Sequence, residues 1–252
     1  MRRLFIYFCT TLFLFSCNQH FVVREVNTRN ISIDSKIGPP DSMIESIVKP
    51  YRDSIQNELS TLVAISSTPL IKGKPESKLT NLVSDLLLEF GNSYCIKQNL
   101  NIYPDIAYVN YGGIRASLPK GEITVERIFE LMPFENEIVM IKISGKAFIL
   151  MAEKIANRGG EGVAGMKLGI RNGLISSLTT GGKPIDPLSF YWVVTNDYIA
   201  NGGDLMNMFL NPVERINTKM RIRDLLIQSL GDRYKRDGII DVKEDGRIFN
   251  EQ

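Results

Sequence analysis

Apolar residues recur at intervals of three and four across residues 75–92, a pattern typical of an amphipathic helix. The apolar positions are Leu79, Leu82, Val83, Leu86 and Leu87. Gly91 is predicted to end this helix, because glycine readily adopts the left-handed conformation that follows a last helical turn. A second helical pattern begins at Asp41, a candidate N-cap, and we expect a break or kink in it at Pro50.

The rest of the chain mixes short apolar runs with further helical patterns. Helices are predicted over residues 124–132, 144–160 and 217–232. Strands are predicted over residues 60–67, 105–110, 136–144, 162–173, 182–197 and 246–250, the fourth of these ending in a turn at Asn172-Gly173. This order lacks the strict strand–helix repeat of a doubly wound sheet. It therefore predicts one α+β domain over residues 41–252, in which helices are layered on a mixed sheet.

The first 17 residues form a targeting segment. Arg2 and Arg3 precede an apolar stretch from Leu4 to Phe15, which is too short to span a hydrocarbon layer of roughly 30 Å. The end of the segment, "LFSC", resembles a bacterial lipobox. We therefore predict a signal peptide over residues 1–16 and a lipidated tether over residues 17–40, attached through Cys17. An ordinary signal peptide and an uncleaved anchor remain alternatives.

Composition and charge narrow the class of protein. The chain is 44% hydrophobic and 23% charged, which is typical of a globular domain. Its 30 basic and 28 acidic residues are scattered, whereas a nucleic-acid interface needs clustered Lys and Arg, so no nucleic-acid partner is predicted. Of the three cysteines, Cys9 leaves with the signal peptide and Cys17 is acylated. Cys95 then has no disulfide partner and is predicted to be a small buried residue.

Three loops combine glycine or proline with an aromatic or charged side chain. They read "NYGGIR" (residues 110–115), "MPFENE" (residues 132–137) and "TNDYIANGGD" (residues 195–204). Paired glycines allow a ligand to approach the backbone, and Arg115 offers a planar fork for an anion. Each loop also has a purely structural interpretation: a tight turn with a solvated Arg115, a core Phe134, or a Tyr198 that packs on the rim.

The joint appearance of these loops resembles the C-terminal, substrate-binding domain of the 5′-nucleotidase family. The matching segments are residues 110–115, 121–124, 133–136, Gly165, 196–204 and 246–248. "TNLVSD", with Asn81, Leu82 and Asp85, also resembles the family's helix start. Each motif is weak by itself, but their order and separation are specific, and together they cover nearly all of the chain beyond the tether.

The resemblance implies roles for nine residues in binding a nucleotide. Phe134 and Tyr198 would sandwich the base, since stacking on aromatic rings is worth about 1–3 kcal/mol per base. Asp204 would accept hydrogen bonds from the ribose hydroxyls, Asn110 would meet the base edge and Arg115 would pair with phosphate. The glycines that would leave room around the ligand are Gly112, Gly113, Gly202 and Gly203.

Two positions depart from the family pattern. Tyr111 stands where the family has the first glycine of a triplet, and its ring either crowds the pocket or points away from it. A phosphate-binding arginine of the family, expected shortly before "TNLVSD", is missing. Lys72 and Lys74 stand there instead, around Gly73, and bind phosphate as point charges rather than as forks.

The residues of the family's catalytic half are also missing from the sequence. The resemblance implies a metallophosphatase domain in which several His, Asp and Asn side chains hold two divalent metals and generate a hydroxide nucleophile. This sequence has a single histidine, His20, so neither a family-type two-metal site nor a Ser-His-Asp triad can be assembled. No catalytic residue, metal ligand or cofactor is therefore predicted within this chain.

The leading hypothesis is a nucleotide-recognition domain of a 5′-nucleotidase-type hydrolase system, which acts in nucleotide catabolism. A separate metallophosphatase chain would supply the metals, and a lipid anchor would hold the protein in a bacterial cell envelope, outside the cytoplasmic membrane, as a periplasmic or outer-membrane lipoprotein. The alternative is a non-catalytic nucleotide-binding or interaction lipoprotein with a degenerate pocket. An independent enzyme of unknown mechanism is a third hypothesis, so the sequence leaves open whether the chain takes part in catalysis.

Overall fold

The computed structural model describes residues 24–31 and 38–251. The predicted signal peptide, Cys17 and His20 lie outside these residues. The chain divides after Val48 into two units, and the core and site described below belong to the second, Lys49–Gln252. None of the helices in the described part of the chain is long and apolar enough to cross a membrane.

Helix α2 (Ser42–Leu59) begins at the predicted N-cap. The Asp41 carboxylate accepts hydrogen bonds from the backbone N–H groups of Met43 and Ile44 at 2.9 and 3.1 Å. The helix is continuous through Pro50, so of the predicted break or kink, the break does not occur. A proline removes one N–H donor, while the neighbouring turns of the helix keep their own hydrogen bonds.

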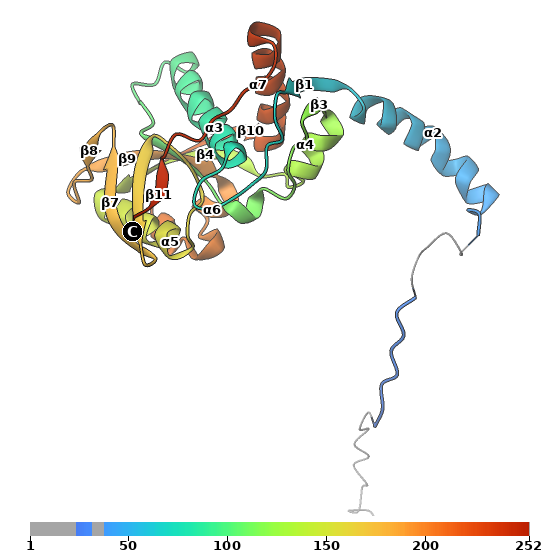
Figure 1. Cartoon of the computed structure of the whole chain (residues 1–252), viewed down its shortest axis with the longest axis horizontal. Helices are drawn as coiled ribbons and strands as arrows, with labels where there is room; N and C mark the ends of the chain where they lie inside the picture. Colours follow the sequence, from blue (N-terminus) through green and yellow to red (C-terminus); the bar gives the residue numbers. More distant parts are fainter. Residues whose placement is uncertain (1–23, 32–37, 252) are drawn as a thin grey trace, which may run out of the picture. The chain divides into compact units, whose positions relative to one another are not determined.

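A five-stranded sheet forms the centre of the fold (Figure 1). Its strand order is β10 (Glu214–Arg221), β4 (Glu137–Ser144), β9 (Phe190–Asn196), β2 (Ile106–Val109) and β5 (Gly162–Ala164). Strands β2 and β9 are parallel, and the other neighbouring strands are antiparallel. The parallel pair matters for the site, because both strands end at the same edge of the sheet.

Two smaller sheets accompany the central one. The first contains β11 (Ile248–Asn250), β6 (Met166–Arg171), β7 (Leu174–Thr180) and β8 (Lys183–Pro184), in that order. The second pairs β1 (Leu62–Ser66) with β3 (Gly121–Thr124). The turn predicted at Asn172-Gly173 joins β6 to β7, with φ of 53° and 76° at the two residues, as a tight hairpin requires.

Strands β4, β9, β2 and β5 of the central sheet contribute buried residues to two cores, one on each face, whereas the edge strand β10 contributes partly buried residues to the first core. Along β2, Ala107 and Val109 belong to one core, whereas Ile106 and Tyr108 belong to the other. This division follows from the two-residue repeat of a strand, in which successive side chains point to opposite faces. Burial on both faces explains why β2 and β9 are almost continuously apolar in sequence.

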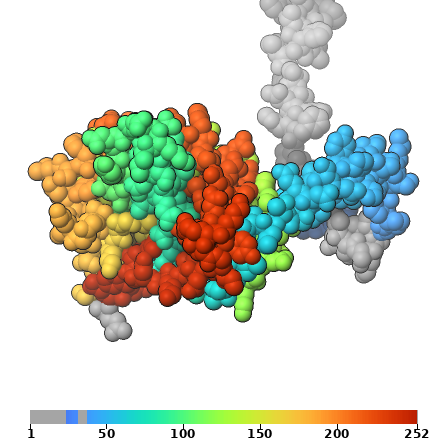
Figure 2. All heavy atoms as spheres, turned by 90° about the horizontal axis from the view of Figure 1, so that it is seen from above, coloured from blue at the N-terminus to red at the C-terminus, as the bar shows by residue number. Residues whose placement is uncertain are grey.

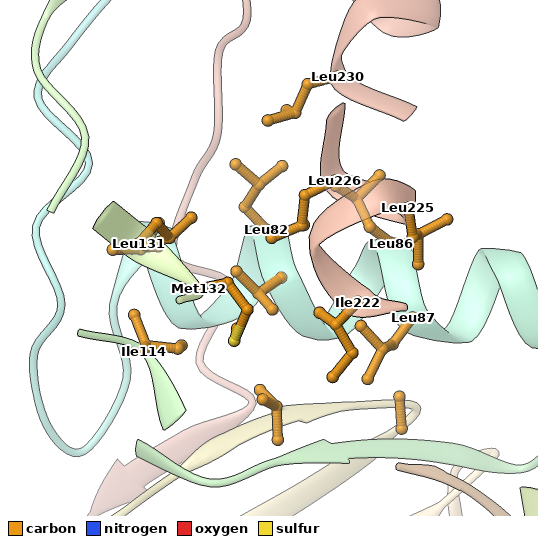
Figure 3. Close-up of a cluster of buried hydrophobic side chains, with 14 of the residues drawn as sticks. Leu82, Leu86, Leu87, Ile114, Leu131, Met132, Ile222, Leu225, Leu226 and Leu230 are labelled. Atoms are coloured by element: carbon orange, nitrogen blue, oxygen red, sulfur yellow. The ribbon is translucent and has the colours of Figure 1, made fainter. Parts of the chain in front are cut away.

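Three helices contribute to the first core: α3 (Lys78–Lys97), α4 (Val125–Leu131) and α7 (Ile222–Asp237). Figure 3 shows Leu82 and Leu86 of α3 facing Leu226 of α7. In the space-filling view, the green surface of α3 and the following loop adjoins the orange-red surface of α7 (Figure 2). Helix α5 (Gly145–Asn157) and the four-stranded sheet supply the second core.

The α+β fold predicted from the sequence is confirmed, as is the buried position of Cys95. The predicted end of α3 is wrong: the helix continues past Gly91 to Lys97. A Cβ at Gly91 would lie 2.6 Å from Val194 Cγ2, so this glycine lets the helix pack closely on β9. Its role is close packing rather than helix termination.

Strands β10, β7 and β3 differ from the sequence predictions, and no strand was predicted over residues 121–124, where β3 lies. Residues 217–221, predicted as the start of a helix, belong to strand β10, and α7 begins at Ile222. Exposed and half-buried residues alternate along β10, which is the two-residue period of an edge strand. Strand β7 lies where no strand was predicted, because most of its residues are polar or partly exposed.

An ion pair explains two of the sequence motifs. Arg247 reaches Asp85 with both terminal nitrogens, at 2.6 and 3.2 Å, and also pairs with Asp245 at 2.7 Å. Burial by itself lowers the pKa of the Arg247 guanidinium. The contacts with Asp245 and Asp85 outweigh this effect and raise the pKa above its ordinary value. The pair therefore links the chain before β11 to helix α3, and Asp85 and Arg247 have a structural role.

Gly165 and Gly181 provide a test of the close approach between β5 and β2. A Cβ at Gly165, where φ is 80°, would lie 2.2 Å from the Asp105 carbonyl oxygen, whereas a Cβ at Gly181, where φ is 54°, would meet open space. We expect Gly181→Ala to lower the free energy of unfolding by about 1–2 kcal/mol through the left-handed backbone alone. Gly165→Ala should cost about 1–3 kcal/mol more, because the added methyl group overpacks the site.

Urea unfolding of both variants measures this difference. Equal losses of stability at the two glycines would show that the β5–β2 approach relaxes at no cost.

Candidate functional site

Three segments meet at one edge of the central sheet. Strands β2 and β9 run in parallel and both end there, at Val109 and Asn196. Strand β4 is antiparallel to β9, and Ile138, near its start, pairs with Asn196. The chain before β4 therefore reaches the same edge as the loops that follow β2 and β9. The three loops singled out in the sequence are brought together in this way.

The three loops enclose a cavity of about 410 Å³. Its lining residues are Asn110, Gly112, Gly113, Arg115, Phe134, Asn136, Tyr198 and Asp204. Seven of these were predicted as site residues, and Asn136 is an addition that lies within the recognised residues 133–136. Gly202 and Gly203 do not line the cavity, although they were predicted to leave room for the ligand.

Two aromatic side chains are exposed at the cavity. Phe134 is 45% exposed and Tyr198 is 47% exposed, and both contribute to its lining. The Arg115 guanidinium lies 6.0 Å from the centroid of the Phe134 ring, within the range of a cation–π contact. Phe134 therefore does not belong to the core, and the cavity offers two flat apolar surfaces beside one cation.

Asp204 presents its carboxylate to this cavity and is held by two neutral donors. The Tyr198 hydroxyl donates to Oδ1 at 2.9 Å, and Asn110 Nδ2 donates to Oδ2 at 2.7 Å. Asn196 in turn donates to Asn110 Oδ1 at 3.4 Å. Since a carboxylate has about four acceptor sites, these two donors leave acceptor capacity for a ligand.

The glycines of the loops make close packing around these side chains possible. A Cβ at Gly113 would lie 2.8 Å from Asn110 Oδ1, and a Cβ at Gly203 would lie 2.5 Å from the Tyr198 ring. Gly202 has a φ of 85°, in the left-handed region. Gly203 therefore makes room for the Tyr198 ring rather than for a ligand.

Tyr111 points away from the cavity, which decides between the two positions left open by the sequence. Its ring is not part of the lining and instead lies beneath the Lys72 and Lys74 ammonium groups, 4.1 and 4.9 Å from its centroid. Lys72 also donates to the carbonyl oxygens of Tyr111 and Ile114, at 3.3 and 2.7 Å. Burial, followed by the charge of Arg115, lowers the pKa of the Lys72 ammonium group.

Comparison with known proteins places the chain in a family. The family model described as "5′-nucleotidase, C-terminal domain" matches residues 63–211, which include every lining residue of the cavity. The chain belongs to this family. This 5′-nucleotidase C-terminal domain thus has its cavity at the loops in which the sequence resemblance was found.

Relatives of the domain are longer proteins. A 5′-nucleotidase of Vibrio vulnificus (strain CMCP6) is 26% identical over 182 residues, which make up 70% of this chain and 32% of that protein. An apyrase of Tabanus yao is 30% identical over 167 residues, or 57% of this chain and 29% of that protein. The chain thus spans about a third of the length of these curated relatives.

A solved structure has the same fold. The structure of a 5′-nucleotidase precursor from Thermus thermophilus superposes with a TM-score of 0.70 at 24% identity. The match covers 85% of this chain and 44% of that one. The α+β architecture is therefore shared with a 5′-nucleotidase of known structure.

Arg158 and Glu161 were missed by the sequence predictions, although they adjoin the site of the 5′-nucleotidase C-terminal domain. Glu161 is 5% exposed and accepts hydrogen bonds from the Tyr111 backbone N–H and from Arg158. Burial raises the pKa of the Glu161 carboxyl, and the Tyr111 hydrogen bond, Lys74 and Arg158 oppose that rise. No motif marks the pair in the sequence, apart from two charges that flank Gly159-Gly160.

The described part of the domain offers no candidate metal centre. Within residues 24–31 and 38–251, no three His, Cys, Asp or Glu side chains gather in a way that could hold a metal ion. These residues therefore do not fit the two-metal site that the sequence resemblance implies for a catalytic half. Their side chains instead offer aromatic rings, a carboxylate and an arginine, which are groups for recognition.

The burial of Glu161 leads to a pH dependence of stability. Because its pKa is raised in the folded chain, ionising this carboxyl costs more in the folded than in the unfolded state. Its contribution to stability is fully present below the ordinary carboxyl pKa and is lost as pH rises through the raised pKa. Relative to a Glu161→Gln variant, which does not titrate there, the wild-type chain should lose stability across that window and then level off.

Urea unfolding of the wild-type chain and Glu161→Gln between pH 4 and pH 8 measures this difference. The opposite slope, with the wild-type chain gaining on the variant as pH rises, would show that the cations around Glu161 outweigh its burial.

Proposed function

We propose that the cavity binds a nucleoside or nucleotide, with the base stacked between Phe134 and Tyr198. The observation that carries this proposal is the Asp204 carboxylate, held on the cavity wall beside two exposed aromatic rings. A carboxylate with free acceptor sites matches the neighbouring hydroxyl groups of a ribose. Flat exposed rings suit a purine or pyrimidine, because every base has a stacking face.

Under this proposal, Arg115 meets the phosphate end of a nucleotide. It is exposed and lines the cavity, and its hydrogen bond to the Gly112 carbonyl oxygen, at 3.1 Å, uses one of its five N–H donors. Lys72 and Lys74 do not replace the family's second arginine under this proposal. Both donate to backbone carbonyl oxygens and face the Tyr111 ring instead.

We further propose that catalysis requires a separate metallophosphatase chain. That chain would supply two divalent metals and the attacking water, while this one holds base and ribose. The proposal is supported by the single histidine of the sequence and by the lack of a metal-binding group in the described residues. The lipobox-like end of the leader suggests attachment through Cys17, on the outer side of the cytoplasmic membrane in a bacterial cell envelope.

Truncating either aromatic side chain should weaken binding without unfolding the domain. Phe134→Ala and Tyr198→Ala should each cost about 1–3 kcal/mol of AMP binding, which is roughly a 5- to 150-fold increase in Kd. Isothermal titration calorimetry of the purified chain with AMP measures this loss. Phe190→Ala is the matched control, because Phe190 is also exposed but lies outside the cavity lining.

The same calorimetry distinguishes a cavity that binds nucleotide from a degenerate pocket. If the wild-type chain takes up neither AMP nor adenosine, the proposed binding function fails and the alternative of a degenerate pocket replaces it.

A reconstitution experiment tests the two-chain hydrolase. The chain is mixed with the metallophosphatase encoded nearest to it, in the presence of divalent metal, and phosphate release from AMP is followed. We expect faster release than from the metallophosphatase alone, and Phe134→Ala should reduce the gain by about the factor seen in its Kd. No gain from the wild-type chain would contradict the division of labour while leaving nucleotide binding intact.

A further inference from the structure

A chain of hydrogen bonds connects the two loops that carry the cavity's polar groups. The backbone N–H of Tyr111, in the loop after β2, donates to Glu161. Arg158 donates to the other carboxylate oxygen of Glu161, at 3.3 Å. The second terminal nitrogen of Arg158 donates to the Asp204 backbone carbonyl oxygen, in the loop after β9. Two side chains outside the cavity thus span the distance between its two walls.

The sequence between Arg158 and Glu161 lets the two side chains face each other. Helix α5 ends at Asn157 and Arg158 is its C-cap. Gly159 and Gly160 follow with φ of 73° and 113°, values that few other residues adopt. A Cβ at Gly160 would lie 2.1 Å from the Pro75 carbonyl oxygen, so the turn also needs glycine for space. The chain therefore reverses sharply and returns Glu161 to Arg158.

Burial makes this pair hard to break. The side chains of Glu161 and Arg158 are 4% and 26% exposed. Separating a buried carboxylate from its hydrogen-bonded cation leaves an uncompensated charge, which is strongly unfavourable. The Arg158 backbone carbonyl oxygen is itself held by Lys74, at 2.5 Å. The position of the Arg158–Glu161 pair is therefore well determined within the fold.

The Asp204 loop needs such support, because its backbone is strained. Asp204 and Leu205 have φ of 51° and 59°, in the left-handed region, although neither is glycine. Each costs roughly 1–2 kcal/mol in that conformation, so two in succession persist only where neighbouring groups hold them. The Arg158 hydrogen bond falls on the carbonyl group of the first strained residue.

We propose that Arg158 and Glu161 are positioning residues, which hold the Asp204 carboxylate where it meets the sugar of the ligand. This inference rests on the nucleoside site proposed above and adds the residues that set its geometry. Neither side chain lines the cavity, so both act through others: Glu161 through the Tyr111 amide and Arg158 through the Asp204 backbone.

The test compares two ligands that differ in the sugar hydroxyls. Adenosine carries the 2′ and 3′ hydroxyl groups that Asp204 would bind, and 2′,3′-dideoxyadenosine lacks them. The wild-type chain should prefer adenosine by about tenfold or more, as expected for hydrogen bonds to a charged group. Arg158→Met should abolish most of this preference and change the Kd for dideoxyadenosine less than twofold. Arg158→Lys should restore part of it, since lysine keeps a donor to the Asp204 carbonyl oxygen.

A loss of stability alone cannot produce this result, because a smaller folded fraction raises the apparent Kd of both ligands by the same factor. Arg171→Met is the matched control: Arg171 pairs with Glu251 at 3.2 Å and does not line the cavity. It should leave the preference for adenosine unchanged. If Arg158→Met raises the Kd for both ligands equally, or leaves the preference for adenosine unchanged, the positioning role is overturned while nucleoside binding stands.

A second measurement tests whether the pair holds the two loops, and its outcome is separate from nucleoside binding, whose absence would contradict the proposed function itself. Amide hydrogen exchange reports the loops without any ligand. Glu161→Leu, which removes the acceptor of the Tyr111 amide, should speed exchange of that amide, and Arg158→Met should speed exchange of the Asp204 and Met206 amides, by about tenfold each. Exchange as slow as in the wild-type chain would mean that the loops keep their positions without the pair, and would overturn the inference.

Discussion

The parallel pairing of β2 with β9 is the constraint on which the candidate site depends. Their register, Ile106 opposite Val193 and Ala107 opposite Val194, makes the two strands end together. Asn110 and Asn196 therefore meet at the same edge, although 86 residues separate them in sequence. The start of β4 joins them because β4 runs antiparallel to β9. A shift of one residue in the β2–β9 register would turn the side chains of one strand to the opposite face and separate these groups.

At this edge of the sheet, uncharged side chains donate hydrogen bonds to the Asp204 carboxylate, whereas charged side chains donate to the backbone of the loops. Asp204 receives its hydrogen bonds from a hydroxyl and an amide, which orient the carboxylate without neutralising it. Lys72, Lys74 and Arg158 each donate to a backbone carbonyl oxygen. The charge of the carboxylate thus stays available at the cavity, while the loops that carry it are tied to the rest of the domain.

The sequence predicted the fold class and most of the cavity lining, because both depend on signals that are local or ordered along the chain. Apolar periodicity gave α3 and the strands β2, β4 and β9, and the order of three loop motifs gave Phe134, Tyr198 and Asp204 together. The roles of Gly91 and Gly203 could not be predicted, because each makes room for a side chain whose approach is set by tertiary packing. Arg158 and Glu161 were missed for the same reason: their partners lie in loops far away in sequence.

The placement of cations also bears on how the proposed ligand is held. Under the proposed function, a nucleotide brings two or more negative charges to its phosphate end, and Arg115 stands at the cavity with most of its donors unused by the described contacts. Lys72 is committed to two backbone carbonyl oxygens, and its proximity to Arg115 lowers its pKa further. One exposed guanidinium neutralises only part of the phosphate charge. An exposed ion pair of this kind contributes at most about 1 kcal/mol to the free energy of binding. The metals of the proposed partner chain would then meet the remaining phosphate charge, so the proposed function assigns the base and ribose to this chain.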